Sequence, residues 1–215
     1  MPRLRVHNFS VSLDGFGAGP NQSIDAPLGE GGEELHEWVF KTRHWGDMTG
    51  DSGAGEEGVS NDFMIAGDEG IGAHIMGRNM FGPIRGDWTD EEWNGWWGDD
   101  PPYHHDVFVL THFARSDIPM QGGTTFHFVT DGIEAALDKA FEAADGKDVR
   151  IGGGASTVQQ YLRAGLIDHL HFAISPVLLG HGERLFEGVG DALSAYRCTQ
   201  FLGTDGVTHA VVTKR

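Results

Sequence analysis

The sequence predicts an α/β protein of three layers, αβα, in which helices cover both faces of a mostly parallel central sheet. Strand patterns alternate with helical patterns along most of the 215 residues, which is typical of βαβ units. The chain then ends in two strand patterns joined by Asp205-Gly206, a dipeptide typical of antiparallel hairpins. We therefore expect one domain over residues 1–215, with loop inserts near 46–60 and 86–105.

The chain begins with a strand and continues into a helix. Apolar and polar residues alternate from Leu4 to Leu13, and Asp14-Gly15 then provides a turn signal. Residues 16–32 are rich in glycine, proline and asparagine, which predicts a loop. From Glu33 to Trp45 the apolar residues have helical spacing, and two glutamates in the first turn oppose the helix dipole.

The next part of the chain is rich in glycine, acidic residues and tryptophan. Its predicted elements are a mobile insert at 46–60, a short helix capped by Asn61 or Asp62 and ending at Asp68, a buried strand at 73–76, a helix start at 77–82 and a long loop at 83–105. The long loop contains Trp88, Trp93, Trp96 and Trp97 without a regular period. We expect these aromatic side chains to pack the loop against itself or to form a lid over a pocket.

The second half of the chain supplies further strands and two amphipathic helices. Its predicted elements are strands at 107–111 and 125–130, a helix at 132–144 capped by Asp131, a strand at 149–151, a tight turn at 152–154, a helix at 155–164, a strand at 169–175, a loop at 176–182, and strands at 193–202 and 207–213. Their β-branched residues identify the strands. An apolar stripe identifies the first helix, and Gly165 ends the second.

The charge balance argues against several classes of partner. A net charge of −17 is unsuited to nucleic acid phosphates and to an anionic membrane surface. No run approaches the roughly 18 apolar residues of a membrane span, and the N-terminus has no signal-peptide pattern. Cys198 is the sole cysteine, so an internal disulfide is impossible. We expect a cytoplasmic protein that binds neither nucleic acid nor membrane.

The strongest local motif is a strand followed by three glycines and a helix start. Gly152, Gly153 and Gly154 let the backbone approach a ligand closely. The free N–H groups at the helix start attract phosphate, and the first turn, Ala155-Ser156-Thr157, adds two hydroxyl donors. By itself, a glycine run after a strand is explained equally well by a tight turn without a ligand. The run also does not match the GxGxxG fingerprint of dinucleotide-binding Rossmann units.

Two further strand ends carry residues that suit an anion or a ribose. Gly77-Arg78-Asn79 follows the strand at 73–76 and places a guanidinium at a helix start. Thr111 and His112 follow the strand at 107–111 and can hold a ribose or its phosphate. The three strand ends together predict an anion site more specifically than any one of them.

With these three motifs the sequence resembles the dihydrofolate reductase superfamily. The motifs that carry the resemblance are Met76-Gly77-Arg78-Asn79-Met80-Phe81, Leu110-Thr111 and Gly152-Gly153-Gly154. The resemblance implies a dihydrofolate-reductase-like fold. It also implies that these motifs bind, respectively, the adenosine-side phosphates, the ribose 2′-phosphate and the pyrophosphate of NADPH.

A closer resemblance is to the reductase domain of riboflavin biosynthesis and its stand-alone bacterial relatives. Ser12-Leu13-Asp14-Gly15 looks like their SLDG motif, and residues 152–186 resemble their glycine turn, helix, strand and P-V-L-L-G-x-G segment. The resemblance implies an NADPH-dependent reductase that transfers a hydride to a C=N or C=O of a small pterin- or pyrimidine-like heterocycle. It also implies a homodimer.

The candidate catalytic residues are Asp14, His36 and Glu37. Asp14 would shape the loop over the nicotinamide, and His36 or Glu37 could donate a proton. Dihydrofolate reductases place a carboxylate on their first helix to hold the pteridine, and here Glu34, His36 and Glu37 are all open alternatives for that position.

The phosphate groups of the cofactor and of the substrate lead to expectations about Arg78, Gly153 and the basic residues near the presumed pocket. Because the protein is acidic, we expect Arg78 to make NADPH bind in preference to NADH. Gly153→Val should abolish cofactor binding and leave a folded protein. The riboflavin-pathway substrate carries a ribose phosphate, and near the presumed pocket the sequence offers Lys41, Arg43 and Arg184 as basic partners.

Two other interpretations concern metals and non-catalytic binding. Among twelve histidines, His169-Leu170-His171 is the one His-x-His pattern, and it lacks a nearby carboxylate or thiolate. We therefore expect no metal site and place these histidines at an edge or interface. The alternative function is a non-catalytic nucleotide-binding or interaction protein on the same fold, with the Trp-rich insert as its partner surface.

The C-terminal hairpin predicts a homodimer by its composition as well. Phe201, Leu202, Val207, Val211 and Val212 would otherwise leave an apolar sheet edge with few charges. We expect a two-fold contact at this edge, to which the strand at 169–175 contributes.

Overall fold

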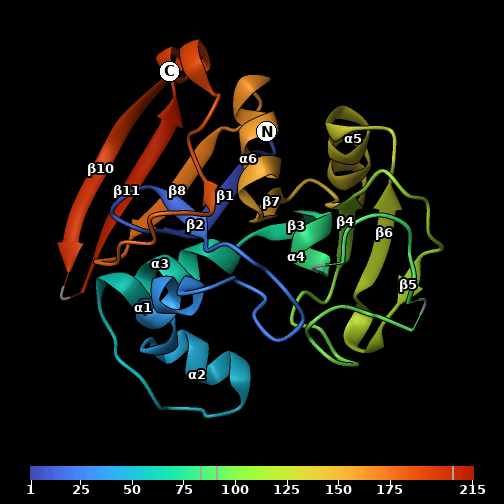
Figure 1. Ribbon diagram of the computed structural model, residues 1–215, viewed down its shortest axis with the longest axis horizontal. Coiled ribbons are helices and arrows are strands. Elements are labelled where there is room, and N and C mark those ends of the chain that lie inside the picture. Colours follow the sequence, from blue (N-terminus) through green and yellow to red (C-terminus); the bar gives the residue numbers. More distant parts are fainter. Residues whose placement is uncertain (83, 91, 205) are drawn as a thin grey trace.

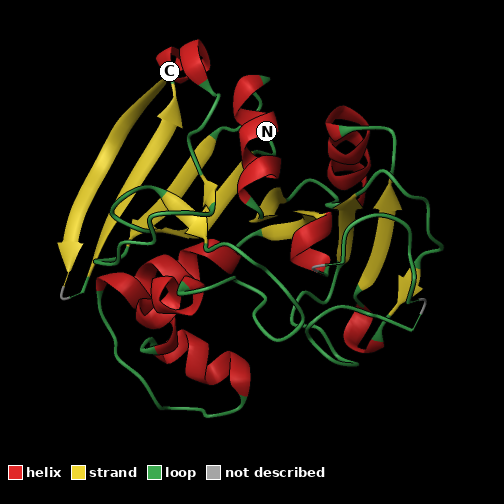
Figure 2. Ribbon diagram, viewed as in Figure 1, coloured by secondary structure: helices red, strands yellow, loops and turns green. Residues whose placement is uncertain are grey.

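The chain folds around one large sheet. In the part that the computed structural model describes, residues 1–215 without 83, 91 and 205, a nine-stranded sheet has the order β10-β11-β8-β1-β7-β3-β4-β6-β5 (Figures 1 and 2). Its strands are β1 (Leu4–Val11), β3 (Ile71–Gly77), β4 (Asp106–Leu110), β5 (Ile118–Pro119), β6 (Thr125–Val129), β7 (Asp148–Gly153), β8 (His169–Ile174), β10 (Tyr196–Thr204) and β11 (Val207–Lys214). The strands from β8 to β6 run parallel, and the two edges are antiparallel. The predicted α/β class with a C-terminal hairpin is confirmed.

Helices cover both faces of this sheet. They are α1 (Glu37–Phe40), α2 (Arg43–Thr49), α3 (Val59–Asp68), α4 (Arg78–Phe81), α5 (Ile133–Ala143) and α6 (Ala155–Arg163), with 3-10 turns at Gly32–His36, Gln121–Gly123 and Gly190–Ala195. In Figure 1, α5 and α6 lie above the sheet, and α1, α2 and α3 lie below it. No described helix is long and apolar enough to cross a membrane.

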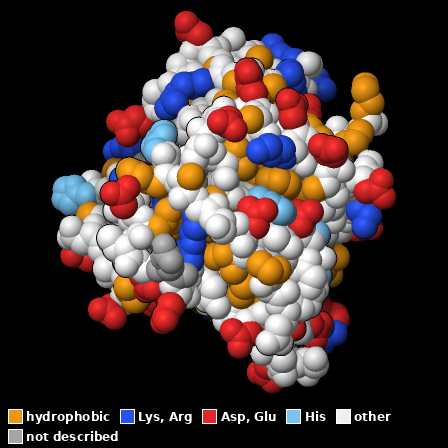
Figure 3. All heavy atoms as spheres, turned by 90° about the vertical axis from the view of Figure 1, so that its right-hand side faces the viewer, with side chains coloured by type: hydrophobic (Ala, Val, Ile, Leu, Met, Phe, Trp, Pro, Cys, Tyr) orange, Lys and Arg blue, Asp and Glu red, His pale blue; other side chains and the backbone are white. Residues whose placement is uncertain are grey.

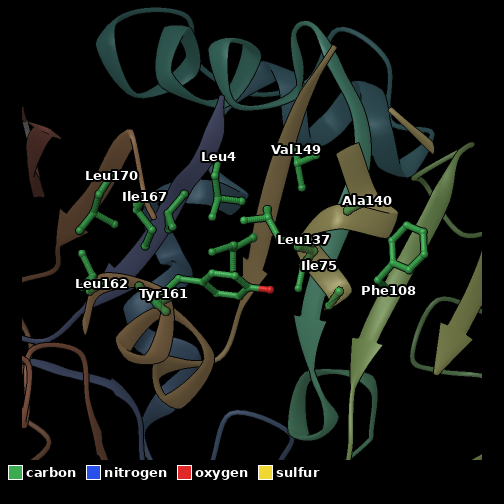
Figure 4. Packing of buried hydrophobic residues seen from close by; sticks show 14 of the residues in the cluster. Leu4, Ile75, Phe108, Leu137, Ala140, Val149, Tyr161, Leu162, Ile167 and Leu170 are labelled. Atoms are coloured by element: carbon green, nitrogen blue, oxygen red, sulfur yellow. The ribbon is translucent and has the colours of Figure 1, made fainter. Parts of the chain in front are cut away.

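The main core lies between the sheet and helices α5 and α6 (Figure 4). Tyr161 and Leu162 of α6 are fully buried against side chains that include Leu4 of β1 and Ile75 of β3. The Tyr161 hydroxyl donates to the carbonyl of Ile133 at the start of α5, at 2.8 Å. Complete burial of one such side chain contributes roughly 1.5–3 kcal/mol. This packing holds α6, and with it the triglycine segment, against the parallel strands.

The predicted helix from Glu33 to Trp45 is divided into three pieces. A 3-10 turn and α1 end at Phe40, and α2 begins at Arg43. Thr42 between them is extended, and its hydroxyl accepts a hydrogen bond from Trp45 N at 3.3 Å, so it caps a new helix. Helix α2 extends to Thr49, so the insert predicted at 46–60 is partly helical.

The two predicted helix caps are wrong. Helix α3 has Gly58 as its cap, three residues before Asn61 and four before Asp62. The buried Asn61 side chain instead accepts a hydrogen bond from His44 N at 2.8 Å. Helix α5 has Gly132 as its cap in place of Asp131, with a φ of 91°. A positive φ strains any residue that has a side chain, which explains the glycine.

Other predicted boundaries shift by tertiary pairing. The predicted loop at 16–32 contains β2 (Phe16–Ala18), which pairs with β9 (Glu183–Arg184) in a small second sheet. The predicted tight turn at 152–154 is the end of β7 followed by the cap of α6. The predicted strand at 193–202 starts at Tyr196, after a 3-10 turn. Strand β5 is too short for a periodic signal. Within the predicted Asp205-Gly206 turn and the predicted loop at 83–105, residues 205, 83 and 91 lie outside the described residues.

A line of hydrogen bonds through buried histidines joins β1, β8, β11 and α3. Asn8 N donates to His171 Nδ1 at 3.1 Å, His171 Nε2 lies 3.0 Å from His209 Nδ1, and His209 Nε2 lies 3.1 Å from Ser60 Oγ. His171 is fully buried because β8 lies between β1 and β11. Since β8 is an inner strand, the expectation that His169 or His171 lies at an edge of the sheet is wrong, and a place at an interface stays a prediction. Among the described residues no three His, Cys, Asp or Glu side chains are grouped to hold a metal ion.

Candidate functional site

A cavity of about 630 Å³ opens along the carboxyl edge of the parallel strands. The ends of β3, β4 and β7 lie side by side there, since Gly77 is in register with Leu110 and Met76 with Gly153. Ligands of open α/β sheets bind outside this edge, where the loops after neighbouring strands converge. The lining of the cavity has two walls and a rim.

The glycine wall comes from the ends of β3, β4 and β7 and from the start of α6. Its residues are Gly77, Arg78, Asn79, Thr111, His112, Gly152, Gly153, Gly154, Ala155, Ser156 and Thr157. These are the residues that the sequence predicts to bind the cofactor, and the fold brings all of them to one cavity. They converge because parallel strands end at the same edge of the sheet.

The N-terminal wall comes from β1, β2 and the segment that leads to α1. Its residues are Asn8, Phe9, Ser10, Gly17, Ala18, Gln22, Pro27, Leu28 and His36. The side chains of Arg85, Trp96, Trp97 and Glu183 belong to the rim of the same lining. Asn79 Nδ2 donates to Gln22 Oε1 at 3.3 Å, so one hydrogen bond joins the two walls.

The start of α6 presents free backbone donors to the cavity. Gly154 is the cap residue and has no side chain to satisfy them, while the N–H groups of Thr157 and Val158 donate back to its carbonyl at 3.1 Å. Helix geometry therefore leaves the N–H groups of Ala155 and Ser156 for a ligand. A Cβ built on Gly154 meets nothing within 4 Å, so the space beside this cap is open.

Arg78 brings a half-buried positive charge to the glycine wall. Its guanidinium carbon lies 3.4 Å from the ring centre of Trp88, and its Nη1 donates to Gly82 O at 3.0 Å. Burial, together with the nearby Arg115, lowers the pKa of Arg78 to about 10, so the side chain stays charged at neutral pH. Its Nε is buried and has no partner among the described residues.

Trp88 is a supporting residue that the sequence does not single out. Its Nε1 donates to Phe113 O at 2.8 Å, which ties the 86–105 insert to the segment after β4. Thr111 starts that segment, and its buried hydroxyl accepts from Phe113 N at 3.2 Å. The insert therefore contributes to the rim of the cavity through Trp96 and Trp97, while Trp88 stacks on Arg78. The four tryptophans of this insert are the feature of the sequence that could have indicated such a contact. The sequence does not indicate which of them stacks on Arg78.

The three candidate catalytic residues separate in the structure. His36 is half-buried and lies on the N-terminal wall, whereas Glu37 is exposed and lies outside the cavity lining. Asp14 also lies outside the lining. Its carboxylate accepts hydrogen bonds from Ser12 Oγ at 2.5 Å and from Gly180 N at 2.7 Å. The bond from Ser12 contributes most to lowering the pKa of Asp14 to about 2, and the residue ties β1 to the 176–182 loop.

His36 is the titratable group of the N-terminal wall. Its Nδ1 lies 3.4 Å from Gly32 O, and a carbonyl oxygen can only accept, so Nδ1 carries the proton in this long contact. Nε2 is therefore unprotonated in the neutral side chain. Burial lowers the pKa of His36 below its ordinary value of 6.5.

The basic residues suggested for a substrate phosphate are placed elsewhere. Lys41, Arg43 and Arg184 are absent from the cavity lining in the part of the chain that the structure describes. Arg43 pairs with Glu57, and the Arg184 guanidinium donates to Asp14 O at 2.8 Å.

The chain is similar to known proteins over nearly its whole length. The sequence model of the RibD C-terminal domain family matches residues 5–205. A curated relative, the uncharacterized protein YyaP of Bacillus subtilis (strain 168), is 24% identical over 97% of this chain and 94% of its own.

Solved structures share the fold at lower identity. A protein from Shewanella sp. PV-4 assigned to riboflavin biosynthesis is 20% identical, with a TM-score of 0.61 over 100% of this chain and 99% of its own. The diaminohydroxyphosphoribosylaminopyrimidine deaminase/5-amino-6-(5-phosphoribosylamino)uracil reductase of Thermotoga maritima is 12% identical, with a TM-score of 0.55 over 100% of this chain and 57% of its own. Dihydrofolate reductase of Enterococcus faecalis, complexed with NADP(H), is 12% identical, with a TM-score of 0.50 over 99% of this chain and 96% of its own.

Proposed function

Because the chain belongs to the RibD C-terminal domain family, we propose that it is an NADPH-dependent reductase of a small pterin- or pyrimidine-like heterocycle. The fold is reductase-like, and the neighbours include a uracil reductase and a dihydrofolate reductase with NADP(H). One observation carries the proposal. Arg78, Thr111 and the open start of α6 converge on a single cavity of a protein whose net charge is −17.

The residues of the glycine wall fit a dinucleotide with a 2′-phosphate. The N–H groups at the start of α6 and the open space beside Gly154 suit the pyrophosphate. Arg78 suits the 2′-phosphate, with Thr111 and His112 nearby. Acidic side chains are scattered over the face shown in Figure 3, so a local guanidinium has to offset an unfavourable general field.

NADPH supplies a hydride when bound, and the protein supplies position and a proton. His36 is the candidate for the proton, since it lies on the N-terminal wall and Asp14 and Glu37 do not. Its neutral form has a bare Nε2, so His36 can donate from that atom only after it has been protonated. Phe9 and Leu28 on the same wall supply apolar surface on which a flat acceptor would pack.

Cofactor titration tests the proposal. The wild type should bind NADPH more tightly than NADH, and Arg78→Ala should weaken NADPH binding by roughly 10- to 100-fold, because a charge-assisted hydrogen bond contributes about 1.5–3 kcal/mol. Arg85→Ala is the matched control, since Arg85 is a second arginine of the lining that pairs with Glu183. Equal affinity of the wild type for the two cofactors would overturn the proposal.

Turnover separates a reductase from a non-catalytic binder. NADPH oxidation, followed by absorbance with a panel of pterin and pyrimidine acceptors, should be faster with at least one acceptor than without. Tight NADPH binding without oxidation across the panel would favour the binder.

A further inference from the structure

We propose that the substrate half of this cavity accepts an uncharged, flat heterocycle that carries no phosphate group. The inference rests on the proposed function and narrows its substrate class. It separates this chain from the Thermotoga maritima neighbour, whose name states a phosphoribosyl substrate.

The first argument is the unequal distribution of anion-binding groups. Arg78 and the free N–H donors at the start of α6 belong to the glycine wall. The described residues of the N-terminal wall include no lysine and no arginine. Its one titratable side chain, His36, has a pKa lowered by burial and is neutral at physiological pH.

The second argument concerns the polar side chains of the N-terminal wall. Ser10 and Gln22 already have partners, and the buried Asn8 amide, which has no hydrogen-bond partner among the described residues, lies beside Gly67 of α3. Ser10 Oγ accepts from Trp38 Nε1 at 2.9 Å. Gln22 donates to Pro27 O at 3.0 Å and accepts from Asn79 at 3.3 Å. A phosphate that entered here would exchange water for a surface with few available donors, and unpaired buried charge is strongly disfavoured. An uncharged ring can use the apolar surface of Phe9 and Leu28.

The third argument concerns Arg85, the remaining cation of the described lining. Its Nη2 lies 3.2 Å from Glu183 Oε1. Glu183 is in register with Ala18 of the N-terminal wall, so a carboxylate stands beside that wall. A substrate phosphate would have to displace this carboxylate and would still be repelled by it.

Riboflavin and its 5′-phosphate, FMN, provide a matched pair of probes. Both contain a flat ring with a fused pyrimidine and a ribityl chain, and they differ in the phosphate alone. Quenching of flavin fluorescence measures their binding to protein saturated with NADP⁺, which occupies the glycine wall. The same titrations without cofactor use the double variant Arg78→Ala/Gly154→Ala, which removes the guanidinium and fills the open space at the start of α6, the two alternative phosphate sites of the glycine wall.

Riboflavin should bind at least about tenfold more tightly than FMN in both settings, since the FMN phosphate would lose its hydration without gaining a partner. Arg85→Gln should change the two affinities equally. FMN binding as tight as riboflavin, a loss confined to FMN in Arg85→Gln, or binding of neither flavin would each overturn the proposal. NADP⁺ titration of the same sample tests the proposed reductase function separately. If NADP⁺ does not bind but riboflavin still binds more tightly than FMN, the proposed cofactor is rejected and the proposed substrate class stands.

Discussion

At the scale of single residues, the site depends on how a guanidinium is kept in place. Arg78 lies on one side of the Trp88 ring at 3.4 Å, and the guanidinium carbon of Arg115 lies 4.8 Å from the same ring centre. Each cation–π contact contributes roughly 0.5–2 kcal/mol. The two arginines repel each other, which adds to the lowering of the Arg78 pKa. The ring holds both charges in a region where burial alone disfavours them.

Replacing Trp88 tests this support. Trp88→Leu should weaken NADPH binding about 3- to 30-fold, because the arginine loses its stacking surface, and should leave NADH binding almost unchanged. A ratio of the two Kd values measures the effect independently of any general loss of fold. Trp93→Phe is the control, since the Trp93 indole donates to Phe81 O within the same insert. If Trp88→Leu weakened the binding of NADPH and of NADH by the same factor, the Trp88 ring would have a packing role alone.

A second residue-scale prediction concerns His36. Because its pKa lies below 6.5 and only the protonated ring can donate from Nε2, the active fraction grows as pH falls through that pKa. The kcat/KM for NADPH oxidation by an active acceptor should therefore rise toward acid pH, and His36→Gln should lack this limb. An identical pH profile in the variant would exclude His36 as the proton donor.

The stability of the fold at acid pH limits the range over which the pH profile can be measured. Burial lowers the pKa of His105, His169 and His209 to about 4, whereas the unfolded chain has the ordinary value of 6.5. The neutral forms therefore contribute stability that is complete above pH 6.5 and is lost as pH falls toward 4. Circular dichroism at each pH identifies the range in which the protein is still folded.

At the scale of elements, we predict that the junction of β7 and α6 controls cofactor access. Gly153 has a φ of 154°, and a Cβ built there lies 3.0 Å from Met80 Sδ. Gly153→Val would therefore strain the backbone and push Met80, so we expect this variant to lose stability as well as binding. The expectation of a normally folded Gly153→Val protein is replaced by this one.

Gly154→Ala is the sharper test of the same junction. Its methyl group meets nothing within 4 Å and its φ of −83° suits alanine, so the fold should persist. The methyl group occupies the open space at the start of α6, and NADPH binding should fall at least about tenfold. Circular dichroism and NADPH fluorescence report the two properties. Gly203→Ala in β10, also open, is the control, and wild-type affinity in Gly154→Ala would show that the pyrophosphate does not approach this cap.

At the scale of the whole molecule, the C-terminal hairpin forms one margin of the sheet (Figure 1). Strand β10 is the edge strand and is exposed along most of its length, with Phe201 66% and Leu202 39% exposed. Exposed apolar edges promote pairing with another chain. Strand β8 cannot contribute its edge to such a contact, because β11 and β1 flank it.

We therefore predict a homodimer that uses β10. Light scattering at micromolar concentration should give about twice the 23.3 kDa chain mass, and Phe201→Glu should lower it to the monomer by placing a charge in the contact. Thr199→Glu places the same charge elsewhere on β10 and therefore tests whether a negative charge anywhere on this strand is enough to separate the two chains. A wild-type mass that stays near 23.3 kDa on concentration would contradict the prediction.

The sequence by itself determined the fold class and the group of residues that forms the glycine wall of the cavity. Parallel strands, their carboxyl ends and the glycines after them are local features, and strands of one direction necessarily end at one edge. Arg78, Thr111 and Gly152–Gly154 could therefore be grouped before any contact was known. The family resemblance followed from the same short motifs.

Only the tertiary structure decided which loops complete the cavity. Trp88 stacks on Arg78, Thr42 divides the first helix, and Asp14 caps a distant loop because of contacts between segments far apart in the chain. The periodicity of a sequence records which residues are apolar, but not which partner a polar or aromatic side chain meets. Such pairings depend on long-range packing, and for that reason the N-terminal wall, to which we assign the substrate, could not be predicted from the sequence.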